Sequence, residues 1–362
     1  MRKRVTIFSR QFDRPLNRGP AKVLKYTIDG LRALNCCPTV NEYSAIKNSI
    51  IWVQDDMLAA IYLHLRRIPT LVGPNLVTLP SELPRVLRNG RSSLTHIVPC
   101  SWVRDLWIVS GGADLSIKIW PVGIGTCRSV EDKPKRDPNK VLVYFKSRDG
   151  QLVDQVLKVL ESVHYEVSLI TYGDYQQDQL VAAAVECSFG IWIAGTETQN
   201  IALMEVLAYG LPLIVLDALS LGENVIRSPK IFPQLRVSPE LSAVRTTSAP
   251  YFDNRCGVKI ERVCDLKAAI QTLAGNLSGF DPAGFIEERH NVVISIESLF
   301  CNQAVASGYS KATSHFFYLN IARLIWLIYI LNSSKTYRFL FWRIGNALKY
   351  GKQAPTNFRG DE

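Results

Sequence analysis

Two glutamates, Glu197 and Glu205, stand eight positions apart in the segment of the sequence that carries the clearest chemical signal. The segment runs from an apolar stretch at 190–193 through a polar loop into a second apolar stretch, which a Gly-Leu-Pro sequence at 210–212 ends. This order predicts a strand, a loop at its carboxyl end and a helix. At 100° per residue, side chains eight positions apart lie close to the same face, so we expect both carboxylates to point into one cleft.

The loop between the two glutamates supplies a second kind of group. It places the backbone N–H groups of Gln199, Asn200 and Ile201 at a helix N-terminus, where unpaired amides form a ready anion site for a diphosphate. Carboxylates beside such a site make sense if each accepts hydrogen bonds from neutral hydroxyls. The competing interpretation is a carboxylate that complements the helix dipole at Glu197 and a solvated mid-helix carboxylate at Glu205.

Other polar residues follow strands elsewhere. Lys146 and Arg148 come directly after the apolar stretch 141–145 and are candidates for phosphate binding, or else two solvated charges. Gln54, Asp55 and Asp56 follow a β-branched stretch at 49–53, where a turn or helix cap is favoured over an acceptor or base role.

The surrounding elements alternate in the manner of βαβ units, which predicts two parallel sheets. We expect a first domain over 1–128, a polar, Pro-containing linker over 129–139, a second domain over 140–310 and C-terminal helices over 311–362. The expected strands lie at 5–8, 49–53, 70–72, 94–98, 116–120, 141–145, 166–170, 190–193 and 213–216, and the expected helices at 21–34, 57–66, 151–162, 175–187 and 200–209, with a short helix that Ser101 caps.

The Glu-x7-Glu segment resembles that of GT-B glycosyltransferases, particularly retaining glycosyltransferase family 4. In that family the first Glu contacts the donor sugar, the intervening amides hold sugar and diphosphate, and the second Glu holds the ribose. By position these roles fall to Glu197, to Gln199, Asn200 and Ile201, and to Glu205. The segments 49–58 and 70–75 resemble the acceptor-side strands, which puts Gln54, Asp55, Gly73 and Asn75 on the acceptor side.

Three positions depart from the family pattern. Asn200 stands where the family has Gly, and Asn is the next residue best able to adopt a left-handed backbone. Gln151 occupies the place of a donor-phosphate Lys, which leaves Lys146 and Arg148 as the cations after the strand. A His of the acceptor domain has no counterpart, because Gln54, Asp55 and Asp56 fill its place.

The resemblance implies an α/β fold of the GT-B type, with two Rossmann-like doubly wound domains facing a cleft. It implies transfer of a sugar, with retention, from a nucleoside diphosphate sugar to a glycan, lipid-linked or other acceptor. The nucleotide sugar would be a co-substrate, with no cofactor and no metal. Two alternatives stay open: a nucleotide-sugar epimerase of the same fold, and a non-catalytic membrane-surface binding protein. The donor base is not specified, although residues 172–175 would lie near it.

Composition narrows the class of protein. A hydrophobic fraction of 47% and a charged fraction of 20% are those of a folded protein, and 362 residues fit two domains. A formal charge of +10 implies an anionic partner, either phosphates or an acidic lipid surface, while no motif supports nucleic acid. The eight cysteines show no CxxC pair, which favours reduced thiols in a cytoplasmic protein.

Two further segments have open interpretations. Residues 316–350 are rich in aromatic and basic side chains, which fits either an amphipathic surface on the inner face of a membrane or helices that return to the first domain. The longest apolar stretch there, 324–331, is too short to span a bilayer. The aromatic loop 248–257 is either a flap over the donor or a structural surface loop with an Arg–Asp pair.

Overall fold

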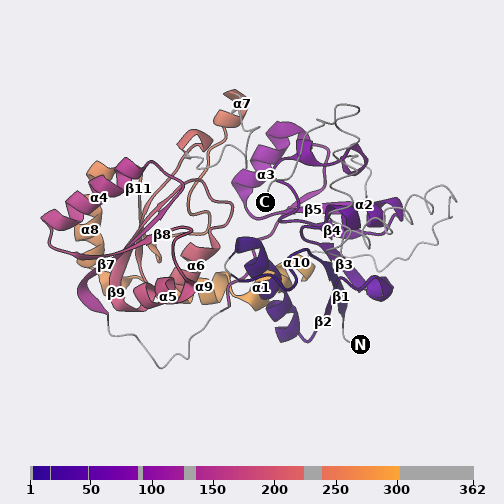
Figure 1. Ribbon diagram of the computed structural model, residues 1–362, viewed down its shortest axis with the longest axis horizontal. Coiled ribbons are helices and arrows are strands. Elements are labelled where there is room, and N and C mark those ends of the chain that lie inside the picture. The colour runs from indigo at the N-terminus through magenta and orange to yellow at the C-terminus, as the bar shows by residue number, and fades with distance from the viewer. Residues whose placement is uncertain are drawn as a thin grey trace, which may run out of the picture.

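The computed structural model describes residues 3–16, 18–47, 49–88, 93–125, 136–223 and 239–301. These residues form two α/β domains, each built on one parallel sheet, that lie beside each other (Figure 1). The predicted fold class, two Rossmann-like doubly wound domains, is confirmed. The C-terminal helices expected over 311–362 and the basic aromatic stretch 316–350 lie outside the described residues.

The first domain holds a six-stranded sheet in the order β2-β1-β3-β4-β5-β6. All of its strand pairs are parallel. Because side chains alternate along a strand, Val5 and Ile7 pack toward α1 while Phe8 packs toward α2. The elements are β1 (Arg4–Phe8), α1 (Gly19–Ala33), β2 (Cys37–Val40), β3 (Ser49–Val53), α2 (Met57–Leu65), β4 (Thr70–Val72), β5 (Leu94–Val98), α3 (Ser101–Trp107) and β6 (Ile117–Ile119).

The second domain holds a five-stranded parallel sheet in the order β11-β10-β9-β7-β8. Its apolar side chains divide into two buried clusters, one beneath α5, α6 and α9 and one beneath α4 and α8. The elements are β7 (Asp137–Lys146), α4 (Gly150–Ser162), β8 (Glu166–Thr171), α5 (Gln177–Glu186), β9 (Cys187–Ala194), α6 (Ile201–Ala208), β10 (Leu213–Leu216), α7 (Pro239–Ser242), β11 (Gly257–Ile260), α8 (Leu266–Ala274) and α9 (Pro282–Arg289).

Each sheet has a switch point, where the strand order reverses. In the first sheet it lies between β1 and β3, and in the second between β7 and β9. Ligands of open α/β sheets bind outside the carboxyl ends of the strands at such points. The loops after these four strands are therefore where the fold places a binding site.

A last helix, α10 (Val292–Cys301), returns from the second domain to the first and packs against α1. The two backbones come so close that a Cβ on Gly30 would lie 2.4 Å from the carbonyl oxygen of Val292. Glycine is required at this contact. The chain thus returns to the first domain before residue 311, and the expectation for helices over 311–362 stays a prediction.

The structure differs from the sequence prediction at several boundaries. Strand β7 begins at Asp137, within the segment expected to be linker, and β2 and β11 were not predicted. Ser101 is the first residue of α3 and not its cap; Cys100 takes the cap position without a side-chain hydrogen bond. Six of the described cysteines are free thiols: Cys36, Cys37, Cys100, Cys187, Cys256 and Cys264. Among the described helices, none has the length and apolar character needed to cross a membrane.

Candidate active site

The switch point of the second sheet brings together two residues predicted from the sequence. Lys146 ends β7 and Glu197 follows β9, and the two strands are hydrogen-bonded neighbours with Lys146 opposite Ala194. The Lys146 ammonium lies 2.6 Å from the Glu197 carboxylate. Burial lowers the pKa of Lys146, but the contact with Glu197 outweighs it and holds the pKa above its usual value. A charged pair therefore stands where the fold places ligands.

The helix that follows begins as the sequence predicted. Asn200 adopts the left-handed conformation, with φ of 62°, and its side chain accepts a hydrogen bond from the backbone N–H of Leu203. In the described part of the chain, no group accepts from the backbone N–H groups of Gln199, Asn200 or Ile201. Unpaired amides at a helix N-terminus are an anion-binding arrangement.

Glu205 is buried, with 6% of the residue exposed, and binds groups from both domains. One oxygen accepts from the Lys22 ammonium at 2.6 Å and from the Gln177 amide at 3.1 Å. The other accepts from the Tyr26 hydroxyl at 2.7 Å. Lys22 and Tyr26 belong to α1 of the first domain, and Gln177 opens α5 of the second. The carboxylate is thus not solvated, contrary to the alternative interpretation of this residue.

Two tyrosines that follow β8, Tyr172 and Tyr175, lie near the charged groups of this region. The ring of Tyr172, which follows β8, lies 4.5 Å from the Lys146 ammonium in a cation–π contact. Burial raises the pKa of Tyr175, which Glu205 raises further and Lys146 lowers. Both Glu205 and Lys146, the partner of Glu197, therefore influence the pKa of Tyr175.

Two other predicted residues turn away from this group. The Arg148 guanidinium donates to the carbonyl oxygens of Ala194 and Asp217 and lies 2.9 Å from Glu223. Its side chain is buried against the ends of β9 and β10, so it positions those strand ends. The Gln199 side chain pairs with both the N–H and the carbonyl of Val122 in the first domain, at 3.0 and 2.6 Å. That contact joins the domains beside the anion site.

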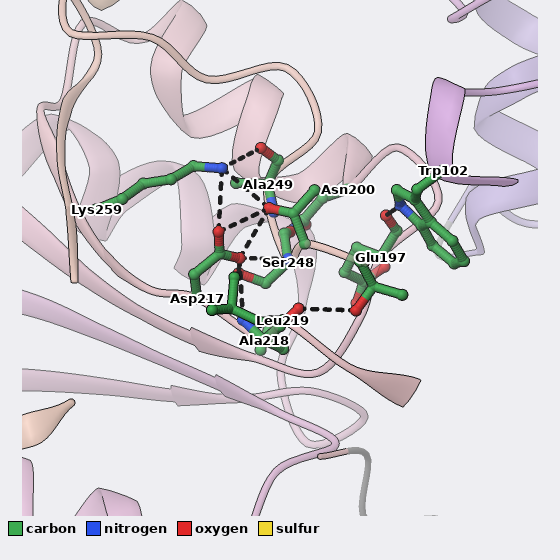
Figure 2. A network of polar contacts seen from close by, with 12 residues as sticks. Trp102, Glu197, Asn200, Asp217, Ala218, Leu219, Ser248, Ala249 and Lys259 are labelled. Atoms are coloured by element: carbon green, nitrogen blue, oxygen red, sulfur yellow. Dashed lines mark hydrogen bonds and ion pairs between the residues drawn. The ribbon is translucent and has the colours of Figure 1, made fainter. Parts of the chain in front are cut away.

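A buried polar network lies beside the Glu197 loop and bonds to it (Figure 2). Asp217, which follows β10, accepts hydrogen bonds from Thr247 and Ser248, and Lys259 lies 3.3 Å away. Burial raises the pKa of Asp217, but Lys259 and these hydrogen bonds outweigh it and leave the pKa below its usual range.

The network reaches the loop through its backbone. The N–H of Glu197 donates to the carbonyl of Thr247, and the Asn200 side chain donates to the carbonyl of Ser248. The first part of the 248–257 loop is thus a structural support. The Arg–Asp pair expected within that loop is not formed by Asp253, because the Arg255 guanidinium pairs with Asp281 and Glu288.

A cavity of about 520 Å³ lies between α3 and the second domain, beside this network. Trp102 closes one side, and its indole N–H donates to the carbonyl of Glu197 at 3.1 Å. The cavity is lined by hydroxyl, cationic and carboxylate side chains, which include Thr247, Arg245 and Glu261. A space of this size beside Glu197 is large enough for a small ligand.

The switch point of the first sheet is filled by its own side chains. Gln54 is buried and its amide donates to the Thr27 hydroxyl at 3.0 Å. Asp55 accepts from the backbone of Arg10 at 2.8 Å and from the Gln11 amide at 2.6 Å. Asp56 caps α2, as the favoured interpretation of this segment predicted. Burial raises the pKa of Asp56.

Gly73 and Asn75 follow β4 at the same edge. Gly73 has φ of +108°, and a Cβ there would lie 2.3 Å from the carbonyl oxygen of Ile97. Its own carbonyl accepts from the Trp52 indole at 2.8 Å. The backbone N–H of Asn75 donates to the carbonyl of Gln54. None of the four residues predicted on the acceptor side lines the cavity described above.

Sequence reasoning missed the roles of Lys22, Tyr26 and Gln177, and the network around Asp217. Lys22 and Glu205 are 183 positions apart, so no local pattern connects them. Asp217 could have been selected, because it directly follows an apolar strand and ligand sites of such sheets lie at the strand ends.

No protein-family model matches this sequence, and no curated protein matches it. Several solved structures are similar in fold. The apo form of the lipopolysaccharide outer core galactosyltransferase WaaB has 9% identity and a TM-score of 0.48 over 83% of this chain and 100% of that one. Sucrose-phosphate synthase from Thermosynechococcus elongatus has 10% identity and a TM-score of 0.48 over 83% and 98%. TarM has 13% identity and a TM-score of 0.44 over 70% and 54%. With TM-scores below 0.5, these similarities say nothing about the substrates of this protein.

Proposed function

We propose that the protein is a glycosyltransferase that takes a sugar from a nucleoside diphosphate sugar and adds it to an acceptor hydroxyl. The observation that carries the proposal is the Lys146–Glu197 pair at the switch point of the second sheet, 2.6 Å apart. Beside it stand the backbone N–H groups of residues 199–201, which have no acceptor among the described residues. A cation, a carboxylate and free N–H groups in one place suit a ligand that carries both phosphates and hydroxyls.

Each group has a proposed role. Lys146 and the amides of residues 199–201 bind the diphosphate and stabilise the charge that develops as it leaves. Glu197 accepts hydrogen bonds from the hydroxyls of the donor sugar, and Glu205 from those of the ribose. Tyr172 offers its exposed ring to the base. Arg148 acts indirectly, because it holds the ends of β9 and β10 in place.

The transfer step forms one bond and breaks another. The acceptor oxygen bonds to the anomeric carbon, while the bond from that carbon to the diphosphate oxygen breaks. The acceptor proton passes to the departing diphosphate, and the configuration of the sugar is retained. We place the acceptor in the cavity beside Trp102, because Trp102 bonds to the backbone of Glu197 and because the cavity is lined by groups that bind hydroxyls. The residues Gln54, Asp55, Gly73 and Asn75 then shape the first domain and do not touch the acceptor.

The test is an assay of nucleotide-sugar hydrolysis and transfer with a panel of uridine, guanosine and adenosine diphosphate sugars. Glu197→Gln and Lys146→Met are each expected to lower turnover about 100-fold, since each removes a group that stabilises the reacting diphosphate or sugar. Product analysis without an acceptor separates transfer from epimerisation.

Lys140→Met is the matched control. Lys140 lies on the same strand and pairs with Glu186 at 2.9 Å, far from the switch point. We expect its turnover to equal that of the wild type. The proposal fails if the wild type neither binds nor turns over any donor, or if the two site variants keep full activity.

A further inference from the structure

The carboxylate of Glu205 binds side chains from both domains. From the first domain, the Lys22 ammonium and the Tyr26 hydroxyl approach it at 2.6 and 2.7 Å. The side chains of Lys22 and Glu205 are 11% and 8% exposed. A buried pair of this kind loses much of its stabilisation when one partner is removed, because the other is left charged and unpaired.

The same carboxylate is the group that a ribose would need. An ionised carboxylate has about four acceptor positions, and three hydrogen bonds from Lys22, Gln177 and Tyr26 already occupy them in part. A vicinal diol requires two. The space around the carboxylate is filled by α1, since Glu205 is only 6% exposed. Ribose and α1 therefore cannot both bind Glu205 as they are placed here.

We propose that Lys22 and Tyr26 form a latch between the domains that the ribose of the nucleotide must displace. The inference rests on the proposed function, because it assumes that Glu205 receives the ribose. The interdomain contact then opposes nucleotide binding, and nucleotide binding weakens the contact to the same extent, as linkage requires. Lys22 and Tyr26 set how tightly the site holds a ribonucleotide without touching it.

Other contacts at the boundary do not oppose the ligand. Gln199 binds the backbone of Val122 through its side chain, which leaves its own backbone N–H free. Trp102 donates to the backbone carbonyl of Glu197 and does not engage its carboxylate. These contacts join the domains on either side of the site, so release of the latch moves α1 locally and does not separate the domains.

The test compares Lys22→Met and Tyr26→Phe with the wild type in calorimetric titrations with uridine, guanosine and adenosine diphosphates and their 2′-deoxy forms. Both variants keep the packing of α1 and remove one hydrogen bond to Glu205. We expect Lys22→Met to bind the preferred ribonucleotide about tenfold more tightly, a change of about 1.4 kcal/mol, and Tyr26→Phe about threefold. The gain is expected to be smaller for the 2′-deoxy form, which offers no vicinal diol.

Lys25→Met is the matched control, because Lys25 lies on the same helix and pairs with Asp29 on α1 itself, 2.5 Å away. Its affinity is expected to be unchanged. Circular dichroism checks that each variant is folded; if Lys22→Met is not, Tyr26→Phe decides alone.

The outcomes separate the two proposals. Nucleotide binding that is unchanged or weaker in the folded latch variants overturns the latch and leaves the proposed function standing. Absence of binding in the wild type and in both variants overturns the proposed function itself.

Discussion

The two switch points of the molecule have the same strand topology, but their polar groups are arranged differently. In the first domain, the Asp55 side chain accepts hydrogen bonds from the loop after β1, and the Gln54 side chain donates one to α1. In the second, Lys146 and Glu197 bind each other beside amides that have no partner in the described chain. The closed edge, in the first domain, is filled by its own buried side chains, although Gln54 Oε1 and Asp56 Oδ2 have no partner in the described chain. The open edge, in the second domain, presents the amides of a helix N-terminus, which have no acceptor among the described residues.

This difference shows that position at a strand end is not enough to define a site. Both sets of residues follow parallel strands and would be selected by the same rule. What separates them is the helix start at each edge: the Asp56 side chain caps the first turn of α2, whereas the backbone N–H groups of residues 199–201 have no acceptor in the described chain. We infer that the first domain contributes shape and the latch on α1, while the second contributes the chemistry.

The largest effect is expected at the closed edge. Gly73→Ala forces a side chain into a left-handed backbone with φ of +108° and into the carbonyl of Ile97. The free energy of unfolding is expected to fall by about 3 kcal/mol or more, measured by denaturant titration. Gly150→Ala is the control, since a Cβ there meets nothing within 4 Å. A stable Gly73→Ala variant that has lost only acceptor binding would contradict the claim that Gly73 shapes the first domain without touching the acceptor.

An intermediate effect is expected at the support of the open edge. Asp217→Asn removes the charge that Lys259, Thr247 and Ser248 stabilise, and is expected to lower stability by about 2 kcal/mol at pH 7. Because the pKa of Asp217 is lowered, its stabilisation is complete above the usual carboxyl value of 3.8 and is lost as the pH falls through the lowered pKa.

The stabilities of the wild type and of Asp217→Asn should therefore converge in acid, as thermal melts at a series of pH values would show. Asp265→Asn is the control, because the ion pair of Asp265 is with the exposed Arg262. A constant difference between wild type and Asp217→Asn at every pH would mean that the charge of Asp217 is not what stabilises the network.

The smallest effect is expected for Gln54→Met. The change removes one hydrogen bond to Thr27, and the other polar atom of the side chain, Oε1, is buried without a protein partner. The loss of stability should stay below about 1 kcal/mol. Transfer kinetics should be unchanged. A large rise in the KM for an acceptor would instead show that Gln54 contacts the acceptor.

The sequence predicted the elements whose apolar pattern is decisive. The bounds of β3, β4, β5 and β10 match the β-branched stretches, which are buried on both faces. Strand β2 was missed because its four residues are only half-buried and include a proline, features that lower the strand signal. Strand β7 extends into polar residues from Asp137, where pairing with β9 at Cys187 overrides local composition.

The site was predictable as far as local rules reach. Asn200 is of a residue type that can adopt a left-handed backbone, and Lys146 and Glu197 are recognisable as strand-end residues, but the sequence did not predict that the lysine and the glutamate pair. The contacts of Glu205 with α1 depend on how two domains pack, which no spacing along the chain encodes. For the same reason the acceptor-side residues were chosen by position, without knowledge that Gln54 and Asp55 bond within the first domain.

Titration of the wild-type protein with a ribonucleoside diphosphate and its 2′-deoxy form tests the central claim most directly. If Glu197, Glu205 and the amides of residues 199–201 hold a nucleotide sugar, the ribonucleotide should bind about tenfold more tightly, and Glu205→Gln should abolish that preference. Equal affinity of the two forms in the wild type, or no binding of either, would contradict the account.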